Sequence, residues 1–434
     1  MERRHSNVSL QALIDDALAE TPPGRVVWVA LSGGLDSSLL LTLTAAACRR
    51  HPRPIHALHV HHGLQVAADG FEAHCRRLAS RLGVPLFIER VTVDQTAGLG
   101  LEGAARQVRY AAFSRRVAPG ETLWLAQHRD DQAETFLLAA LRGSGVRGLA
   151  GMPPGREWQG RHLVRPLLAR SRAELEAEAV RLGVRWVDDP SNADEAFDRN
   201  FLRRSVLPLL QSRWPHAAQA LAGSAQRAAE AELLLDELAH CDLTAQGGDP
   251  ARLPLAGLRA LAPARRRSLV RYACRRLGLA PPPSARLENL LIQLEARHDA
   301  RVRLDWTGAE ARVWRGKLYL RPIHATLGVG WCTEWDGAPP LPLPWGEVHM
   351  GLAPADGRAV RLTLRARQGG ERLRLAGRGG RDLKRLLQEL DVPPWERERL
   401  LVAWHDQTPV AALQPDSLRW VAVAEGWQAS IGRG

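Results

Sequence analysis

The sequence predicts an α/β domain with a doubly wound parallel sheet in its N-terminal half, then a mainly helical domain and a small α+β domain at the C-terminus. Three observations predict this order. Between residues 26 and 126, short apolar runs alternate with helical patterns, which is typical of strand-helix-strand units. Helical Ala/Leu patterns follow from residue 217, and a Pro/Gly-rich linker over 328–357 introduces a basic segment. We therefore expect domains at 1–215, 216–327 and 328–434.

The first strand-helix unit contains a glycine-rich turn. The apolar run 26–31 predicts a buried parallel strand, and residues 39–48 predict a helix. The turn between them, residues 32–38, reads Ser-Gly-Gly-Leu-Asp-Ser-Ser. Unpaired backbone N–H groups and the positive helix end favour an anion at such a turn, and the serine hydroxyls add donors. A carboxylate cannot help to bind a bare phosphate, so Asp36 suggests a metal ion beside it.

Other nucleotide-binding motifs do not fit this turn. A P-loop needs a lysine, but the only lysines are Lys317 and Lys384, and the turn also lacks the GxGxxG spacing. A plain N-capped helix could follow Ser-Gly-Gly, yet it would have no need of Asp36. SGGxDS instead resembles the signature of the PP-loop ATP pyrophosphatases, which cleave ATP between the α- and β-phosphates. The resemblance implies that ATP is bound by Ser32, Gly33, Gly34, Leu35, Asp36 and Ser37.

Further strands and helices follow in alternation. We expect strands near 55–59, 85–90 and 123–126, and helices near 8–20, 71–82 and 101–110. Three histidines, His59, His61 and His62, stand at the end of the second strand and could suggest a metal site. No cysteine or carboxylate cluster completes a ligand set there, so we favour ordinary strand-end histidines.

Two arginines share one face of the helix around residues 101–110. Arg106 and Arg109 are three residues apart, and Glu102 lies one turn before Arg106. Such spacing is common on solvent-exposed helix faces, and by itself it favours that interpretation. Arginines that contact an ATP phosphate would have the same spacing, so only context can decide between the two.

Acidic residues gather at the end of the fourth strand. The segment Gln-His-Arg-Asp-Asp-Gln-Ala-Glu runs over residues 127–134, and a helix that starts at Asp130 brings Asp131 and Glu134 to one face. The helix dipole alone favours acids in a first turn. Three acids and a histidine at the carboxyl end of a parallel strand go beyond that, and indicate Mg²⁺ or a positively charged amine substrate.

The composition indicates a polyanionic partner. The formal net charge is +12, and nearly all of the basic residues are arginines, whose planar guanidiniums suit phosphate. The five cysteines form no CxxC pair, which is typical of a reducing compartment. The N-terminus has no apolar leader, and no apolar run approaches the length of a membrane span. We therefore expect a cytoplasmic protein without a membrane partner.

The later part of the chain predicts RNA contacts. Helices are expected over 217–238, 265–277 and 285–295, followed by short strands near 301–304, 311–314 and 317–321. Residues 358–400 contain 12 basic and 6 acidic side chains, a net of +6. Such a segment suits a phosphate backbone, although a solvated arginine-rich surface remains an alternative.

Taken together, the motifs resemble those of the tRNA(Ile)-lysidine synthetase family of PP-loop enzymes. Those motifs, in chain order, are SGGLDSS, HVHHGLQ, EGAARQVRY, HRDDQAETFLL, RPLL, DPSN, RNFLR, RDLKRLLQE and VPPWER. The match spans most of the chain, although residues 404–427 follow the family only loosely. One departure is Gln127, because the family often has a histidine there, before His128.

The resemblance implies both a reaction and its residues. ATP adenylates C2 of the wobble cytidine in a tRNA(Ile) with a CAU anticodon, and the ε-amino group of lysine then displaces AMP to give lysidine. In this reading Asp36 holds Mg²⁺ or acts near the reacting centre, and Arg106 neutralises charge on the α-phosphate. The lysine would be recognised by Asp131, Glu134, Asn200 and Arg203, with Arg199 in the same RNxxR segment.

Two alternatives remain at this point. A PP-loop tRNA thiolase should have paired catalytic or cluster-binding cysteines, which the sequence lacks. A non-catalytic, nucleotide-dependent RNA-binding protein would have no use for the acid pair Asp131 and Glu134. The sequence leaves open whether the chain is a monomer or a homodimer.

Overall fold

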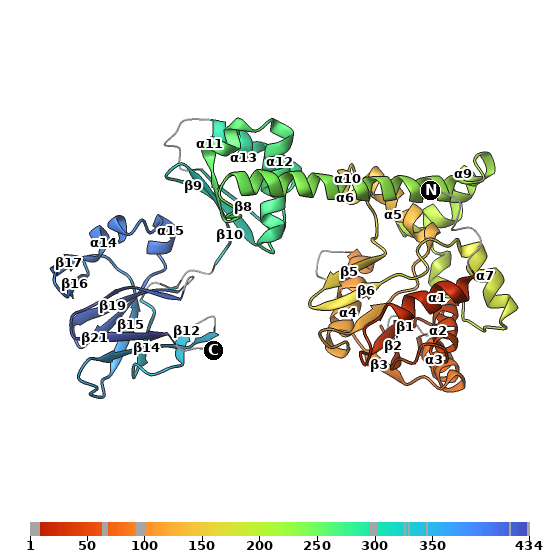
Figure 1. Ribbon diagram of the computed structural model, residues 1–434, viewed down its shortest axis with the longest axis horizontal. Coiled ribbons are helices and arrows are strands. Elements are labelled where there is room, and N and C mark those ends of the chain that lie inside the picture. Colours follow the sequence, from red (N-terminus) through yellow and green to blue (C-terminus); the bar gives the residue numbers. More distant parts are fainter. Residues whose placement is uncertain are drawn as a thin grey trace. The chain divides into compact units, whose positions relative to one another are not determined.

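The computed structural model describes residues 9–62, 68–92, 100–295, 302–324, 327–328, 330–343, 346–415 and 418–431 (Figure 1). Residues 63–65 of the HVHHGLQ motif and the side chain of Glu102 lie outside what is described. The chain forms two compact units, 1–238 and 239–434, and each is considered by itself.

A six-stranded sheet forms the centre of the first unit. Its strand order is β3-β2-β1-β4-β6-β5, and every neighbouring pair is parallel except the β5–β6 hairpin. This confirms the predicted parallel sheet. The strands are β1 (Val27–Ala30), β2 (Ile55–His61), β3 (Leu86–Arg90), β4 (Thr122–Trp124), β5 (Gly155–Trp158) and β6 (Arg161–Val164).

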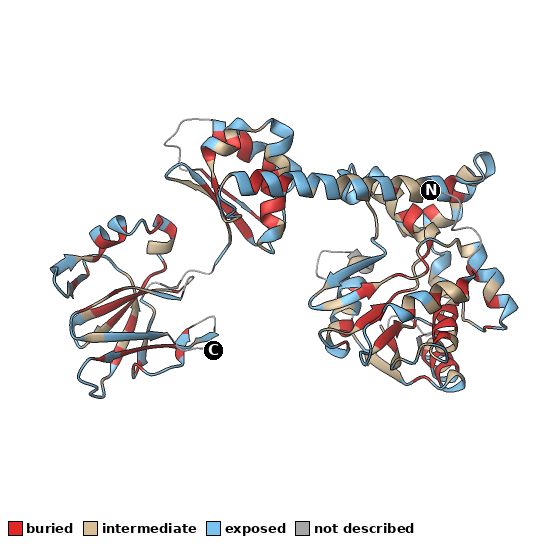
Figure 2. Ribbon diagram, viewed as in Figure 1, coloured by how far each residue is buried: buried red, intermediate tan, exposed pale blue. Residues whose placement is uncertain are grey.

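Helices cover both faces of this sheet, as its doubly wound topology requires. On one face, buried leucines and alanines of four helices pack with β1 in a single core (Figure 2). On the other face, Phe113 and Val117 pack against Trp28 and Leu163. The first face carries α1 (Leu10–Ala19), α2 (Leu35–Ala47), α3 (Ala68–Leu82) and α7 (Arg172–Arg181), and the second carries α4 (Gly100–Arg116).

The strand order brings the two predicted motifs together. From β1 the chain builds outward through β2 and β3, and then returns to place β4 on the other side of β1. In such sheets, ligands bind outside the carboxyl ends of the strands at this switch point. The glycine-rich turn follows β1, and α5 (Arg129–Leu141) follows β4, so both border one crevice.

Some elements of this unit have no counterpart in the sequence-based predictions. The hairpin of β5 and β6 turns at Gln159 and Gly160, whose φ values of 50° and 73° suit a tight two-residue hairpin turn. The RNxxR segment is irregular, with a 3₁₀ turn at Pro190–Ala193, α8 at Asp198–Phe201 and a π-helical turn at Leu202–Val206. Short helices α6 (Val146–Leu149) and α9 (Leu207–Arg213) and the long α10 (Ala217–Ala245) complete the region.

The second unit begins with helices packed on an antiparallel sheet of order β7-β10-β9-β8. This agrees with the helices and short strands predicted there. The elements are β7 (Arg252–Pro254), α11 (Leu255–Ala260), α12 (Pro263–Arg276), α13 (Ser284–Glu295), β8 (Arg303–Trp306), β9 (Ala309–Trp314) and β10 (Lys317–Pro322).

The rest of the second unit is an antiparallel β structure with two short helices, around its own hydrophobic core. Its main sheet has the order β11-β15-β18-β19-β20. The predicted domain boundaries at 215 and 327 stay predictions. The elements are β11 (Cys332–Trp335), β12 (Leu341–Leu343), β13 (Gly346–Val348), β14 (Met350–Pro354), β15 (Leu362–Ala366), β16 (Arg372–Leu375), β17 (Gly379–Asp382), α14 (Leu383–Glu389), α15 (Pro394–Arg397), β18 (Leu401–His405), β19 (Thr408–Gln414), β20 (Arg419–Val423) and β21 (Trp427–Ile431). Within the described residues, no helix has the length and apolar character needed to span a membrane.

Candidate functional site

The turn between β1 and α2 has a backbone that only glycine adopts easily. Gly33 has φ of +95°, and a Cβ there would lie 3.1 Å from Phe71 Cδ1 and 3.3 Å from Cys75 Sγ. Gly34 is the N-cap residue of α2, and no side chain caps this helix. The first-turn N–H groups therefore remain available to an anion.

Serine hydroxyls hold this turn in shape. The Ser37 Oγ accepts from the backbone N–H of Ser32 at 3.1 Å and of Gly33 at 3.3 Å, and lies 3.0 Å from the Ser32 Oγ. The Ser37 hydroxyl also donates to the Gly34 carbonyl at 3.1 Å. Leu35 is buried in the core of the unit, and this packing anchors the turn. The turn is thus preformed without a ligand.

Asp36 lies in the first turn of α2, just after the glycine-rich turn. Its carboxylate accepts two hydrogen bonds from the Arg172 Nη1, at 2.9 and 3.2 Å. Burial raises the pKa of Asp36, although His128 and Arg172 oppose that shift. An additional cation beside Asp36 would therefore favour its charged form.

His128, the last residue before α5, is buried among three carboxylates. Its Nε2 lies 3.4 Å from Asp131 Oδ2 and 3.8 Å from Asp36 Oδ2, and its Nδ1 lies 3.6 Å from Asp130 Oδ2. Burial opposes the charged imidazolium, but Asp130, Asp131 and Asp36 outweigh it and raise the pKa of His128. His128 thus links the end of β4 electrostatically to the turn after β1.

Four charged side chains next to His128 form ion pairs with one another. Glu134 is 0% exposed; its oxygens accept from Arg203 Nε at 2.6 Å, Arg199 Nε at 2.7 Å and Arg203 Nη2 at 3.0 Å. Asp131 Oδ1 accepts from Arg203 Nη2 at 2.9 Å and Arg199 Nη2 at 3.4 Å. Although burial disfavours charge, these carboxylates raise the pKa of both Arg199 and Arg203. We call Asp131, Glu134, Arg199 and Arg203 the charge quartet.

Two of the predicted site residues make other contacts. Asn200 donates from Nδ2 to the carbonyls of Ser191 at 2.9 Å and Asp194 at 2.8 Å, so it secures the loop beside the charge quartet. Arg106 is exposed on α4, where its Nη2 donates to the Tyr110 hydroxyl at 3.4 Å. Neither side chain touches Asp36, Asp131 or Glu134 in this structure.

Two further residues belong to the site region. Arg172 contacts Asp36, but its sequence context, a Ser-Arg-Ala-Glu capping box at the start of α7, signals only a helix N-terminus. Gln127, which departs from the family pattern, accepts from the buried Arg165 Nε at 3.1 Å. An amide oxygen can accept this bond, so the substitution keeps an ordered contact.

Two of the three strand-end histidines make ordinary contacts. The His59 Nδ1 lies 2.8 Å from the Leu31 carbonyl, and His61 Nε2 lies 3.2 Å from Asp69 Oδ1. Throughout the described ranges, no three His, Cys, Asp or Glu side chains are arranged to hold a metal ion by themselves.

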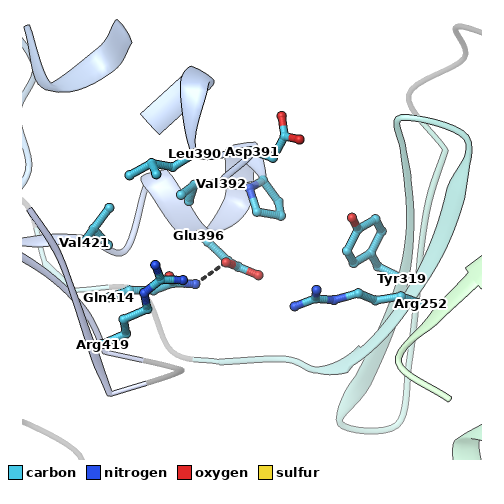
Figure 3. A pocket seen from close by; sticks show the side chains of 10 residues that line it. Arg252, Tyr319, Leu390, Asp391, Val392, Glu396, Gln414, Arg419 and Val421 are labelled. Atoms are coloured by element: carbon cyan, nitrogen blue, oxygen red, sulfur yellow. Dashed lines mark hydrogen bonds between the residues drawn. The ribbon is translucent and has the colours of Figure 1, made fainter. Parts of the chain in front are cut away.

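The second unit contains a cavity of about 200 Å³ (Figure 3). Gln414 donates to Glu396 on one side of it, and Arg252 and Tyr319 face them from the other. Its arginines are offset by Glu396 and Asp391, so the cavity offers no concentrated charge for a phosphate. Its lining residues are Arg252, Tyr319, Leu390, Asp391, Val392, Pro393, Glu396, Gln414, Arg419 and Val421.

Comparison with known protein families agrees with this architecture. A PP-loop domain model matches residues 3–210, a TilS substrate binding domain model matches 253–319, and a TilS substrate C-terminal domain model matches 362–427. A solved structure of the U34-tRNA thiolase NcsA from Methanococcus maripaludis, with its [4Fe-4S] cluster, is 15% identical with a TM-score of 0.42, and covers 50% of this chain and 76% of the thiolase chain. That likeness is too weak to bear on fold or function.

Curated relatives match nearly the whole chain. The tRNA(Ile)-lysidine synthase of Xanthomonas axonopodis pv. citri is 49% identical, over 91% of this chain and 90% of the relative. The enzyme of that name from Xanthomonas campestris pv. campestris is 45% identical, over 90% and 91%. That from Pseudomonas syringae pv. tomato is 43% identical, over 95% and 96%. With this identity over nine-tenths of its length, the chain belongs to the tRNA(Ile)-lysidine synthase family.

Proposed function

We propose that the protein attaches lysine to the wobble cytidine of a tRNA(Ile) with a CAU anticodon, at the expense of ATP. The observation that carries this proposal is the meeting of an uncapped, glycine-rich helix start and a charge quartet in one crevice. The first suits the phosphates of ATP, and the second has charges of both signs, as an amino acid substrate has. The cytidine C2 oxygen attacks the α-phosphate and pyrophosphate leaves; the lysine amine, once deprotonated, attacks C2 and AMP leaves.

ATP would be held by the turn from Ser32 to Ser37. Backbone N–H groups and hydroxyls there suit the pyrophosphate that departs. Asp36 would hold Mg²⁺ together with the phosphates, since Mg²⁺ typically uses one or two carboxylates plus substrate oxygens. The single carboxylate at the uncapped helix start, with Arg172 as its present partner, fits such a site. Mg²⁺ would supply neutralisation of phosphate charge.

Lysine would be recognised by the charge quartet. Its ε-ammonium suits Asp131 and Glu134, and its carboxylate suits Arg203. Because these groups are paired with one another in the free protein, lysine would enter by exchange of partners. The ammonium would take the carboxylates, and the guanidinium thereby released would take the lysine carboxylate. No charge would then be left buried and unpaired.

Arg106 would turn from Tyr110 toward the α-phosphate, since its side chain is exposed and its hydrogen bond to Tyr110 is long. Asn200 would act on lysine through the loop that it secures or through a changed contact. In the second unit, exposed basic side chains on β16, the turn after it, β17 and α14 suit the tRNA backbone. They are Arg372, Arg378, Arg381, Lys384 and Arg385. A tRNA substrate also implies a cytoplasmic location.

The proposal has a direct test. Purified protein is incubated with ATP, Mg²⁺, labelled lysine and tRNA(Ile) carrying CAU. We expect lysine in the tRNA, with AMP and pyrophosphate released in equal amounts. The absence of incorporation under conditions where the protein is folded and binds ATP would contradict the proposal, and transfer of sulfur would indicate a thiolase.

A further inference from the structure

Guanidiniums and aromatic rings line the seam between α4 and the β5–β6 hairpin. The Arg106 Cζ lies 4.9 Å from the centre of the Tyr110 ring, and the Arg156 Cζ lies 6.0 Å from the same ring. Trp158 meets Tyr110 edge to face, with ring centres 5.4 Å apart. Figure 1 shows α4 beside these strands. We call Arg106, Tyr110, Arg156, Trp158 and Arg165 the Tyr110 seam.

Arg165 connects this seam to the crevice. It follows β6, is 3% exposed and donates from Nη1 to the Pro153 carbonyl at 2.7 Å. Its Nε donates to Gln127, the residue immediately before His128. The seam therefore begins at the carboxyl ends of β4 and β6, next to the candidate site, and continues along α4 within the same unit.

Among the described side chains, which leave out that of Glu102, no carboxylate pairs with the guanidiniums of the seam. Burial, together with the charges of Arg156 and Arg106, lowers the pKa of Arg165. Among the residues that the structure describes, no ion pair is found for Arg106, Arg156 or Arg165. Glu157 follows Arg156 in the strand, so it points to the opposite face, where it pairs with His162 at 2.8 Å. Clustered guanidiniums of this kind favour a bound anion.

We propose that the Tyr110 seam, through Arg156 and the rings of Tyr110 and Trp158, binds the phosphates of the single-stranded RNA nucleotides that flank the modified cytidine, while Arg106 at its edge turns toward the α-phosphate of ATP. This rests on the proposed function, and adds an RNA surface on the catalytic unit itself. Aromatic rings interleaved with arginines suit unpaired nucleotides, because guanidinium planes contact both phosphates and bases. The phosphates of ATP are assigned to the turn after β1, which leaves the seam to an RNA strand that enters the crevice.

The test uses the full chain with Arg156→Gln, since Arg156 is exposed and its loss should leave the fold intact. Binding of an anticodon stem-loop with CAU is measured by fluorescence anisotropy at salt concentrations from about 50 to 200 mM. We expect affinity to fall about three- to tenfold, and the slope of log affinity against log salt to decrease by about 0.7, as for one lost single-strand phosphate contact. Arg156→Lys should recover most of the affinity, because it keeps the charge.

Arg49→Gln is the matched control, because it removes one exposed positive charge just after α2, before the amino end of β2 and so away from the carboxyl ends of the strands. It should leave stem-loop binding unchanged. The proposal is overturned if both variants weaken binding equally, or if Arg156→Gln raises the KM for ATP while stem-loop binding stays as it was. A wild-type protein that neither binds this RNA nor incorporates lysine would instead overturn the proposed function.

Discussion

The two halves of the crevice handle charge in opposite ways. No side chain caps the start of α2, which follows the turn after β1. Its first N–H donors are therefore available to an anion. The charge quartet beside it is already neutralised, because each carboxylate accepts hydrogen bonds from guanidiniums. In the proposed function, this difference makes the first a preformed site for phosphates and the second a site for lysine that opens by exchange. The two halves should therefore respond differently to mutation.

The largest effect is expected for Asp36→Asn. The substitution keeps the shape of the side chain but removes the charge at the mouth of the turn, so kcat should fall roughly 10²–10³-fold. Steady-state AMP release measures it. Asp15→Asn is the control, because Asp15 pairs with the half-exposed Arg50 on the protein surface. If both variants lose activity to the same extent, charge at the turn is not decisive.

Glu134→Gln should disrupt the charge quartet. We expect the KM for lysine to rise on the order of 10- to 100-fold, while that for ATP changes little, because the turn after β1 does not depend on Glu134. Initial rates at varied lysine and varied ATP separate the two.

Glu72→Gln provides a matched control for Glu134→Gln. Glu72 is also a buried acid bonded by two arginines, Arg76 and Arg90, but it lies on α3 and outside the charge quartet. It should lower stability without changing the KM for lysine. Equal effects of Glu134→Gln on lysine and ATP would count against the assignment of Glu134 to lysine.

Gly33→Ala should distort the preformed turn. The positive φ and the close approach of Phe71 make a Cβ costly, by about 1–3 kcal/mol of unfolding free energy. The KM for ATP should rise more than that for lysine. In Gly83→Ala the φ of +68° is also positive, but the added Cβ meets open space, so ATP binding should be spared. If the KM for ATP rises in both variants, backbone strain at a positive φ would explain the effect, and the shape of the turn after β1 would not be needed for it.

The smallest effect concerns pH. Because the pKa of His128 is raised above its usual 6.5, its protonation stabilises the folded state below that value. This contribution is lost as the pH rises through the higher folded-state pKa. Urea unfolding with a chelator present should therefore show wild-type stability falling with pH above neutrality, relative to His128→Asn. The exposed His216→Asn should retain the wild-type trend.

Local patterns predicted the half of the site that a single segment builds. The turn at residues 32–37 follows its strand and begins its helix as expected, because apolar periodicity and glycine spacing act over short distances. The acidic start of α5 was predictable for the same reason. These elements also explain why the doubly wound sheet could be recognised from sequence.

The other half depends on contacts between distant segments. That Glu134 is fully buried beneath Arg199 and Arg203, about 65 residues later, follows from packing that no local pattern encodes. The same holds for Arg172 at Asp36 and for the β5–β6 hairpin. The π-helical turn at Leu202–Val206, which carries Arg203, likewise has no sequence signature in the chain.

The exchange of charge partners is tested most directly by the binding of lysine and of cadaverine, which lacks the carboxylate, to wild type and to Arg203→Gln. Wild type should bind lysine well and cadaverine poorly, because a diamine cannot satisfy the guanidinium that it displaces. Arg203→Gln should weaken lysine binding yet strengthen cadaverine binding, whereas Arg204→Gln, one residue away and paired with Glu195, should change neither. Titration calorimetry measures all six affinities. A loss of affinity for both ligands in Arg203→Gln would contradict the exchange and leave Arg203 with a structural role.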